Sequence, residues 1–151
     1  MDATALARRL LAPVPVHRAV QLEVISAVDG RAEVRMADAA GLTSPAGALH
    51  SSGLITLIDA VGIAAMIAAA EDDDAFTDVS VLGTAASLEF RRPAFGPLTA
   101  VCQLDAEGVV AVAPLLARTA EKVSVCTSAQ VLDGDGVVVC EGRFRWSVRR
   151  R

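Results

Sequence analysis

Residues 49–70, LHSSGLITLIDAVGIAAMIAAA, decide the fold. Apolar residues recur throughout this stretch without a polar stripe, so the sequence predicts a long helix that is buried on every side. A hydroxyl at the start of a helix accepts hydrogen bonds from the free N–H groups of the first turn, which makes Ser51 or Ser52 the expected N-cap.

One carboxylate interrupts this helix. Between His50 and Glu71 the only ionisable side chain is Asp59. A buried carboxylate is costly unless it is paired, hydrogen-bonded or used in chemistry. Asp59 is therefore the first candidate for a functional residue. The alternative is a structural aspartate that is hydrogen-bonded to the backbone or to a neighbouring hydroxyl.

Size and composition limit the class of protein. The 151 residues are expected to form one domain, residues 1–151, with residues 1–15 as an N-terminal helix and lead-in. A net charge of −4 and the absence of Tyr give no general attraction to nucleic acid. The basic residues 143–151 are expected to be a solvated strand end. Three cysteines without metal-ligand spacing predict buried, reduced thiols.

The sequence gives no sign of membrane contact. Residues 1–15 lack the basic region and the long apolar core of a signal peptide. The apolar run 54–70 is at the short limit for a membrane span and carries Asp59 near its middle, so we expect a core helix. A cytoplasmic location is the expectation that follows.

Before the central helix the pattern predicts a short helix and a hairpin. Residues 3–11 indicate the helix, which the following prolines end. His17 lies beside one of these prolines and is expected at the surface. Asp29-Gly30 is a type I′ turn signal that joins strands over residues 18–28 and 31–36. Residues 38–48 are rich in Gly, Pro and Ser and form a loop.

After the central helix the chain predicts an antiparallel sheet. The acidic run 71–74 is expected to be a solvated loop rather than a metal site, because like charges oppose the dipole at a helix end. Residues 108–118 fit either a bulged strand or a short helix. Strands are predicted over residues 77–92, 98–106, 122–132 and 137–148. One apolar helix with a long antiparallel sheet implies an α+β fold in which the curved sheet wraps the helix.

Three short motifs occur in order along the predicted helices and strands. Gly47–Ser52 reads GALHSS, with Asp59 nine positions after the histidine. Residues 90–96 read FRRPAFG, and residues 133–144 read DGDGVVVCEGRF. Together they resemble the motifs G-x-x-H-G-G, F-x-x-P-A-x-x-G and D-x-D-G-x-V-V-x-x-G-x-F of the hot-dog fold acyl-CoA thioesterases, particularly the phenylacetate-degradation (PaaI-like) branch. The resemblance covers residues 18–148.

The resemblance implies hydrolysis of an acyl-CoA thioester, with coenzyme A as part of the substrate and no further cofactor or metal. Asp59 would act as general base or nucleophile. The N–H groups of Ser51 and Ser52 would form the oxyanion hole, because the amides of a first helical turn are unpaired. His50 would be catalytic or would hold the helix start in place.

This sequence also departs from the family pattern. The asparagine often found six residues before the histidine is Ser44, and a motif glycine is Ser51. The Ser or Thr that orients water in some members falls on Gly83, with Thr84 beside it. The cationic pair Arg91 and Arg92 could bind the phosphates of coenzyme A, although a solvated arginine pair is the alternative.

The spacing between His50 and Asp59 implies a shared site. Nine residues at about 100° each place the two side chains on opposite sides of the helix, some ~13 Å apart along its axis. One substrate carbonyl cannot contact both within a single chain. The helix start of one subunit would have to meet Asp59 of another, which predicts a homodimer or a homotetramer.

Two other functions remain open. A non-catalytic protein that binds acyl-CoA or an acyl lipid on the same fold is favoured by the departures from the family pattern. A hydratase or dehydratase would require a catalytic histidine in an Asp/His or His/Glu arrangement, and only His50 is available for this role.

Overall fold

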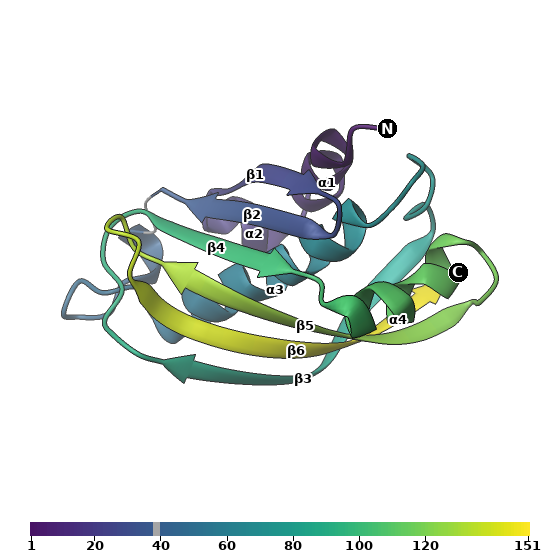
Figure 1. Ribbon diagram of the computed structural model, residues 1–151. Helices are drawn as coiled ribbons and strands as arrows, with labels where there is room; N and C mark the ends of the chain where they lie inside the picture. The colour runs from purple at the N-terminus through teal and green to yellow at the C-terminus, as the bar shows by residue number, and fades with distance from the viewer. Residues whose placement is uncertain (38–39) are drawn as a thin grey trace.

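One antiparallel sheet organises the chain, which the computed structural model describes for residues 1–37 and 40–151 (Figure 1). The strands lie in the order β1-β2-β4-β5-β6-β3, and every neighbouring pair is antiparallel. Their bounds are β1 Leu22–Val28, β2 Arg31–Met36, β3 Val79–Phe90, β4 Leu98–Gln103, β5 Lys122–Leu132 and β6 Val138–Arg150. The four strands predicted after the central helix are thus confirmed, with small shifts at their ends.

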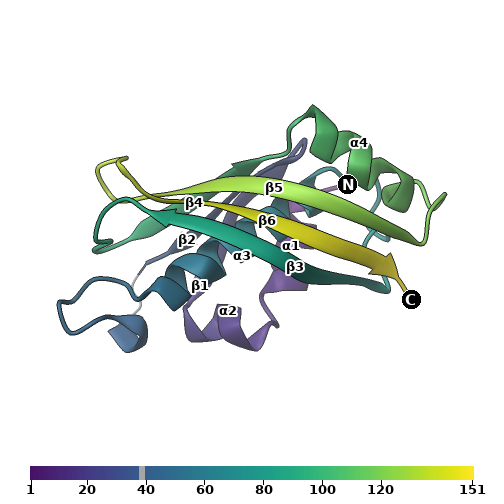
Figure 2. The ribbon, with the colours of Figure 1, turned by 90° about the horizontal axis from the view of Figure 1, so that it is seen from below.

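The central helix α3 (Ser51–Ala68) lies across the concave face of the sheet and contacts all six strands (Figures 1 and 2). In β5, every second residue from Val125 to Val131 is buried toward the helix and the residues between are exposed. By length and composition α3 could cross a membrane, but 67% of it is buried inside this fold. The predicted helix wrapped by a curved antiparallel sheet is confirmed.

Along one line, however, α3 is not buried. Ile55 is 39% exposed, and its neighbours along this line are exposed or half-buried. These residues recur every three or four positions and therefore share one side of the helix. Because two of them are isoleucines, the composition gave no warning that this side is open. We call them the open stripe: Ser52, Ile55, Thr56, Asp59 and Ile63.

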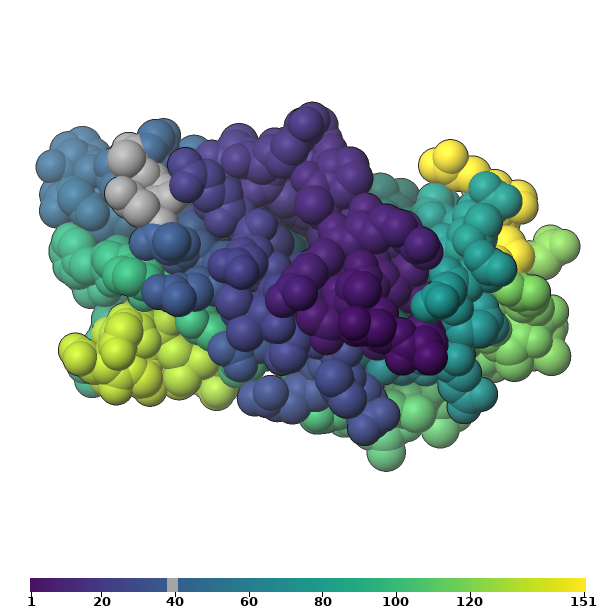
Figure 3. Space-filling view, turned by 90° about the horizontal axis from the view of Figure 1, so that it is seen from above, coloured from purple at the N-terminus to yellow at the C-terminus, as the bar shows by residue number. Residues whose placement is uncertain are grey.

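The N-terminal residues add a helix that the sequence did not predict. Helix α1 (Ala3–Leu11) has the predicted bounds, but α2 (Pro15–Ala19) follows it. Pro15 begins α2, because the N–H that proline lacks is unpaired in a first turn anyway. Strand β1 consequently starts at Leu22 rather than at residue 18. Figure 3 shows these N-terminal elements in the middle of one face, between the loop that precedes α3 and the C-terminal end.

The predicted turn between β1 and β2 is confirmed. Asp29 and Gly30 have φ angles of 50° and 72°, the pair of positive values that a type I′ turn requires. Of the predicted loop 38–48, residues 38–39 lie outside the described residues, and Ala40–Leu42 form a 3₁₀ turn.

The ambiguous segment 108–118 is part of a helix, α4 (Ala106–Leu116). Asp105 caps it, because its carboxylate accepts the Gly108 N–H at 2.7 Å. Pro114 lies inside the helix near its end. The cap, which precedes the ambiguous segment, was the signal that would have favoured the helix.

The cysteines only partly follow the prediction. All three are free, with Cys102 and Cys140 buried and Cys126 exposed on β5. Burial raises the pKa of the Cys102 thiol to about 12 and that of Cys140 to about 11. The alternation of β5 directs Cys126 away from α3, so the expectation of three buried thiols is wrong for this residue.

Candidate functional site

Helix α3 is capped by a histidine rather than by a serine. The Nδ1 atom of His50 accepts the Ser52 N–H at 3.1 Å, and the Ser52 hydroxyl lies 2.9 Å from the same atom. The proton of a neutral His50 ring therefore belongs on Nε2. The expectation that Ser51 or Ser52 is the N-cap is wrong, because an imidazole nitrogen accepts the amide in place of a hydroxyl.

The cap decides which backbone donors remain available. The Ser52 N–H is used by the His50 ring, and the Gly53 and Leu54 N–H groups donate to the His50 carbonyl oxygen at 2.9 and 3.4 Å. The Ser51 N–H has no hydrogen-bond partner in the described part of the chain. Of the two amides predicted to form an oxyanion hole, that of Ser51 is the free one.

Backbone hydrogen bonds join the start of α3 to the segment after β3. The Leu49 N–H donates to the Ala94 carbonyl at 2.8 Å, while Ser44 is held in a turn by a 2.7 Å bond from its N–H to Ala48. A cavity of about 340 Å³ opens between these two segments. It is lined by Leu49, Ser51, Leu54, Phe90, Arg91, Arg92, Pro93 and Ala94.

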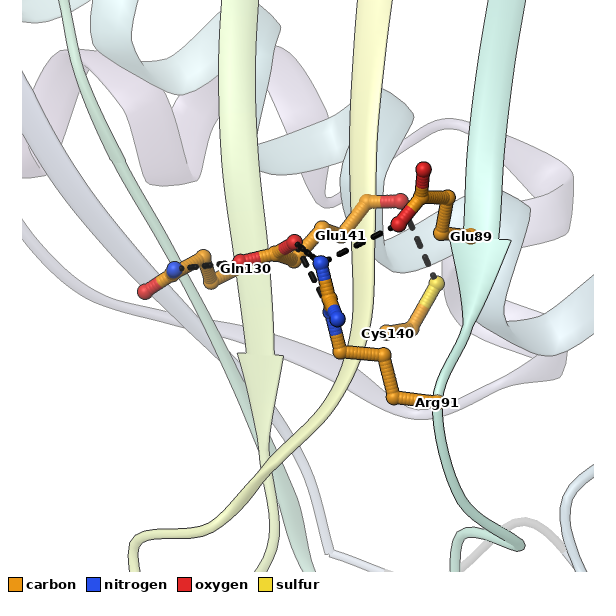
Figure 4. Close-up of polar contacts among 5 residues, drawn as sticks. All are labelled: Glu89, Arg91, Gln130, Cys140 and Glu141. Carbon is orange, nitrogen blue, oxygen red and sulfur yellow. Dashed lines mark hydrogen bonds and ion pairs between the residues drawn. The ribbon is translucent and has the colours of Figure 1, made fainter.

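The two arginines beside this cavity differ in their partners. The Arg91 guanidinium is directed at two carboxylates, donating to Glu141 at 2.8 Å and to Glu89 at 3.1 Å (Figure 4). Together with a hydrogen bond from Gln130, Arg91 holds the pKa of Glu141 below its usual range. Arg92 is exposed and has no ion pair within residues 1–37 and 40–151. Arg92 is thus the available cation at the cavity.

Asp59 lies on the open stripe, two turns further along α3. Its side chain is 33% exposed, and no hydrogen-bond donor within the described residues reaches its carboxylate. Burial raises the pKa of Asp59, and the nearby His17 partly offsets this effect. The carboxylate therefore lacks the hydrogen bond from the backbone or from a hydroxyl that the structural alternative requires. Thr56, one turn earlier, donates instead to the Ser52 carbonyl at 2.8 Å.

His17 is the residue that sequence reasoning missed. The expectation that it lies at the surface is wrong, since its exposed fraction is 2%. Its Nε2 atom lies 4.0 Å from Oδ2 of Asp59, and its Nδ1 atom lies 3.0 Å from the Leu11 carbonyl oxygen. Pro15 could have been interpreted as the first residue of a helix, but the side to which His17 turns depends on the packing of α2 on α3.

Gly83 and Thr84 lie away from the cavity, on the edge strand β3. A Cβ atom on Gly83 would lie 3.3 Å from the ring of Phe144, so the absence of a side chain makes room for that ring. Phe144 is stacked on Trp146 with ring centroids 4.7 Å apart. Thr84 interrupts the pairing of β3 with β6, and its hydroxyl donates to the Arg145 carbonyl at 3.0 Å.

The described residues form no metal centre. No group of three or more His, Cys, Asp or Glu side chains among residues 1–37 and 40–151 is placed to hold a metal ion. The residues of the acidic run Glu71–Asp74 are exposed, as expected for a solvated loop, and Asp72 forms an ion pair with Arg118 at 3.6 Å.

A family model described as "Domain of unknown function (DUF4442)" matches residues 3–148. The chain belongs to the DUF4442 family. No curated protein matches it.

Solved structures share the fold of this DUF4442 chain. PaaI from the phenylacetic acid degradation operon of E. coli is 18% identical, with a TM-score of 0.72 over 99% of this chain and 93% of PaaI. A thioesterase family protein from Silicibacter pomeroyi is 15% identical, with a TM-score of 0.71 over 99% and 100% of the two chains. A Pseudomonas aeruginosa protein of unknown function, described as "Probable Thioesterase", is 24% identical, with a TM-score of 0.72 over 99% and 94%. The predicted resemblance to PaaI-like hot-dog proteins is confirmed for the fold.

The candidate residues of the DUF4442 chain form two separate groups. Ser51, Arg91 and Arg92 meet at the cavity beside the start of α3. Asp59 does not line this cavity and lies instead beside His17. One chain therefore does not bring the free amide and the carboxylate together.

Proposed function

We propose that this protein hydrolyses an acyl-CoA thioester, with Asp59 as general base or nucleophile. The observation that carries the proposal is the Asp59 carboxylate itself, which is two-thirds buried in an apolar helix without a hydrogen bond from the described residues. Burial raises its pKa, and a raised pKa suits a carboxylate that must accept a proton from water. The fold shared with thioesterase-family proteins supports the same reaction class.

The free Ser51 N–H is the donor we assign to the developing oxyanion. Asp59 removes a proton from water as the water oxygen bonds to the thioester carbonyl carbon and the carbonyl oxygen becomes negative. The C–S bond then breaks, the coenzyme A thiolate leaves and takes up the proton from Asp59, and the carboxylic acid is released. An unpaired amide at a helix start favours negative charge, because the helix dipole is positive there. Ser52 is not assigned this role, because its N–H already donates to the His50 ring. Arg92 is the cation we assign to the coenzyme A phosphates.

We further propose that the site is shared between two copies of the chain. Strand β3 supports this, because it ends the sheet with 12 residues of which none is buried. Leu82 and Phe90 on this strand are 65% and 53% exposed, and Glu89 is its one charged residue. Such a long, weakly charged edge is a ready template for pairing with another strand. The open stripe of α3, with its two isoleucines, gives a second copy an apolar surface to cover.

The first experiment measures free-thiol release from short, medium, long and aromatic acyl-CoAs. We expect turnover of at least one substrate class by the wild type and its loss in Asp59→Asn. Asp135→Asn is the matched control, because Asp135 is an exposed aspartate in the turn between β5 and β6. No turnover of any substrate, or equal turnover by Asp59→Asn, would refute the proposed mechanism.

Complementation tests the shared site. Ser51→Pro removes the proposed oxyanion donor, and proline is tolerated at the first position of a helix. Each mixed dimer of Ser51→Pro with Asp59→Asn would contain one site with both groups intact. Activity should therefore return when the two inactive variants are unfolded and refolded together. A site contained within one chain would show no such recovery.

A second candidate function is binding of an acyl-CoA or acyl lipid without hydrolysis. The observation that favours it is the Phe144 ring at Gly83, the position at which the resemblance places the water-orienting Ser or Thr of some PaaI-like thioesterases. This function predicts a higher melting temperature in the presence of an acyl-CoA, without thiol release from the same compound.

A further inference from the structure

The burial of His17 calls for an explanation. Among the residues whose burial is described, only His17 and Thr127 are buried polar side chains. Thr127 is satisfied, since its hydroxyl accepts the Trp146 Nε1–H at 2.9 Å. His17 instead has one hydrogen bond to the backbone and, on its other side, the Asp59 carboxylate.

The backbone fixes which nitrogen of His17 carries a proton. A carbonyl oxygen only accepts hydrogen bonds, so the 3.0 Å contact with Leu11 requires a hydrogen on Nδ1. In a neutral ring Nε2 then has a lone pair, and this lone pair faces Oδ2 of Asp59. A neutral ring opposite an ionised carboxylate would bring two lone pairs together. The arrangement is favourable when one further proton resides on either His17 or Asp59.

Among the charged side chains on the elements around His17, Asp59 is the one that faces the imidazole ring. Helix α2 packs on α3 and β1. The charged side chains nearest along α2 and β1, Arg18 and Glu23, are exposed. On α1, Arg8 donates to backbone carbonyls of β1. Within the described residues, His17 is the one basic side chain within 4.0 Å of the Asp59 carboxylate, and the two form an ion pair when His17 is protonated.

We propose that His17 is a positioning residue for the reaction: its imidazolium, held by Leu11, keeps Asp59 ionised and leaves the exposed side of the carboxylate to the substrate. The proposal rests on the function proposed above. With an exposed fraction of 2%, His17 acts through Asp59 and does not itself contact the substrate. The direction of the electrostatic effect agrees, because His17 lowers the pKa of Asp59 against the effect of burial.

The pH dependence of kcat/KM tests the proposal. In His17→Asn the amide can still donate to Leu11, but the positive charge is lost. We expect the acid limb of the profile to move to higher pH, with a several-fold lower rate on the acid side, the wild-type plateau at alkaline pH and an unchanged KM. Arg18→Gln, which removes an exposed positive charge from the same helix, should keep the wild-type profile. Superimposable profiles for both variants would overturn the proposal.

A second measurement does not depend on activity or on the folding of the His17 variant. Nitrogen NMR of the wild-type imidazole should show a protonated Nδ1 throughout the titration, and Asp59→Asn should change the resonance of Nε2. An unprotonated Nδ1, or nitrogen resonances that do not respond to Asp59→Asn, would overturn the pairing. Absence of thiol release with these NMR signatures present would refute the proposed function and leave the His17–Asp59 pair established.

Discussion

Gly62 sets how closely α3 approaches the sheet, and replacing it with alanine tests this packing. A Cβ atom at this position would lie 2.7 Å from the Thr127 hydroxyl oxygen and 3.3 Å from Cζ2 of Trp146. The hydroxyl cannot turn away freely, because it accepts the Trp146 indole N–H at 2.9 Å. Either the helix moves out or a buried hydrogen bond is lost. Gly62 is one turn from Asp59, so the same contact positions the candidate carboxylate.

Two opposing terms determine the effect on stability. Alanine is better than glycine inside a helix by about 1 kcal/mol. Overpacking, or a buried N–H left without its acceptor, costs about 1–3 kcal/mol, and a contact as short as 2.7 Å places the cost in the upper half of that range. The net expectation is a loss of about 1–2 kcal/mol in the free energy of unfolding, or about 2–8 °C in Tm for a chain of this size.

Urea unfolding of wild type and Gly62→Ala measures the difference. Gly134→Ala is the matched control, because no atom lies within 4 Å of the position of its Cβ. A double variant with Thr127→Ala should remove most of the penalty of Gly62→Ala, since the clashing hydroxyl is then absent. If Gly62→Ala instead stabilises the protein by the full helical gain of about 1 kcal/mol, α3 does not pack closely on Thr127 and Trp146 at Gly62.

Three further predictions follow from the site and its surroundings. Because the folded-state pKa of Asp59 is raised above 3.8, the folded protein holds this proton more tightly than the unfolded chain, and stability is lost as pH rises through the folded value. Asp59→Asn should therefore raise Tm at neutral pH and lose this advantage below the unfolded pKa; an equal or lower Tm at neutral pH would show that pairing with a charged His17 outweighs the desolvation of Asp59. Ellman's reagent should modify Cys126 rapidly and the two buried thiols only after denaturation, and three fast thiols would show that the inner face of the sheet is open. Ile55→Lys places a charge on the open stripe and should shift the sedimentation of the proposed dimer toward the monomer, whereas an unchanged sedimentation would mean that this surface is not in the proposed interface.

Local patterns were sufficient for most of the fold. The central helix follows from an apolar run that is too long for one strand, and the first hairpin follows from Asp29-Gly30, whose positive φ angles fit few other residues. The alternation in residues 122–132 gave β5 its bounds and its buried face. These features are determined by residues that are close together in the sequence, so local patterns are sufficient to predict them.

The parts that the sequence did not reveal depend on contacts between distant residues. His50 replaces a serine cap because its backbone is held by the Leu42 carbonyl, with an N–O distance of 2.7 Å. The burial of His17 requires α2 to pack on α3, and nothing in residues 15–19 by themselves indicates that contact. The exposure of the open stripe could not be predicted from composition, because an isoleucine such as Ile55 is expected in the core and only the position of the sheet shows that it is exposed.

The proposed roles of His17 and of the exposed strand edge both affect the ionisation of Asp59. A carboxylate that acts as a base must be ionised, yet the chain offers it an apolar helix and no hydrogen bond from the described residues. A second copy covering the open stripe would remove more water from Asp59 and disfavour the ionised form further. The charge that opposes this desolvation then has to come from inside the chain, and the His17 ring occupies that position, with Nδ1 locked on the backbone and Nε2 facing the carboxylate. If Asp59 is a base buried in an interface, it needs a positive charge within its own chain, and a protonated His17 beneath the open stripe would supply that charge.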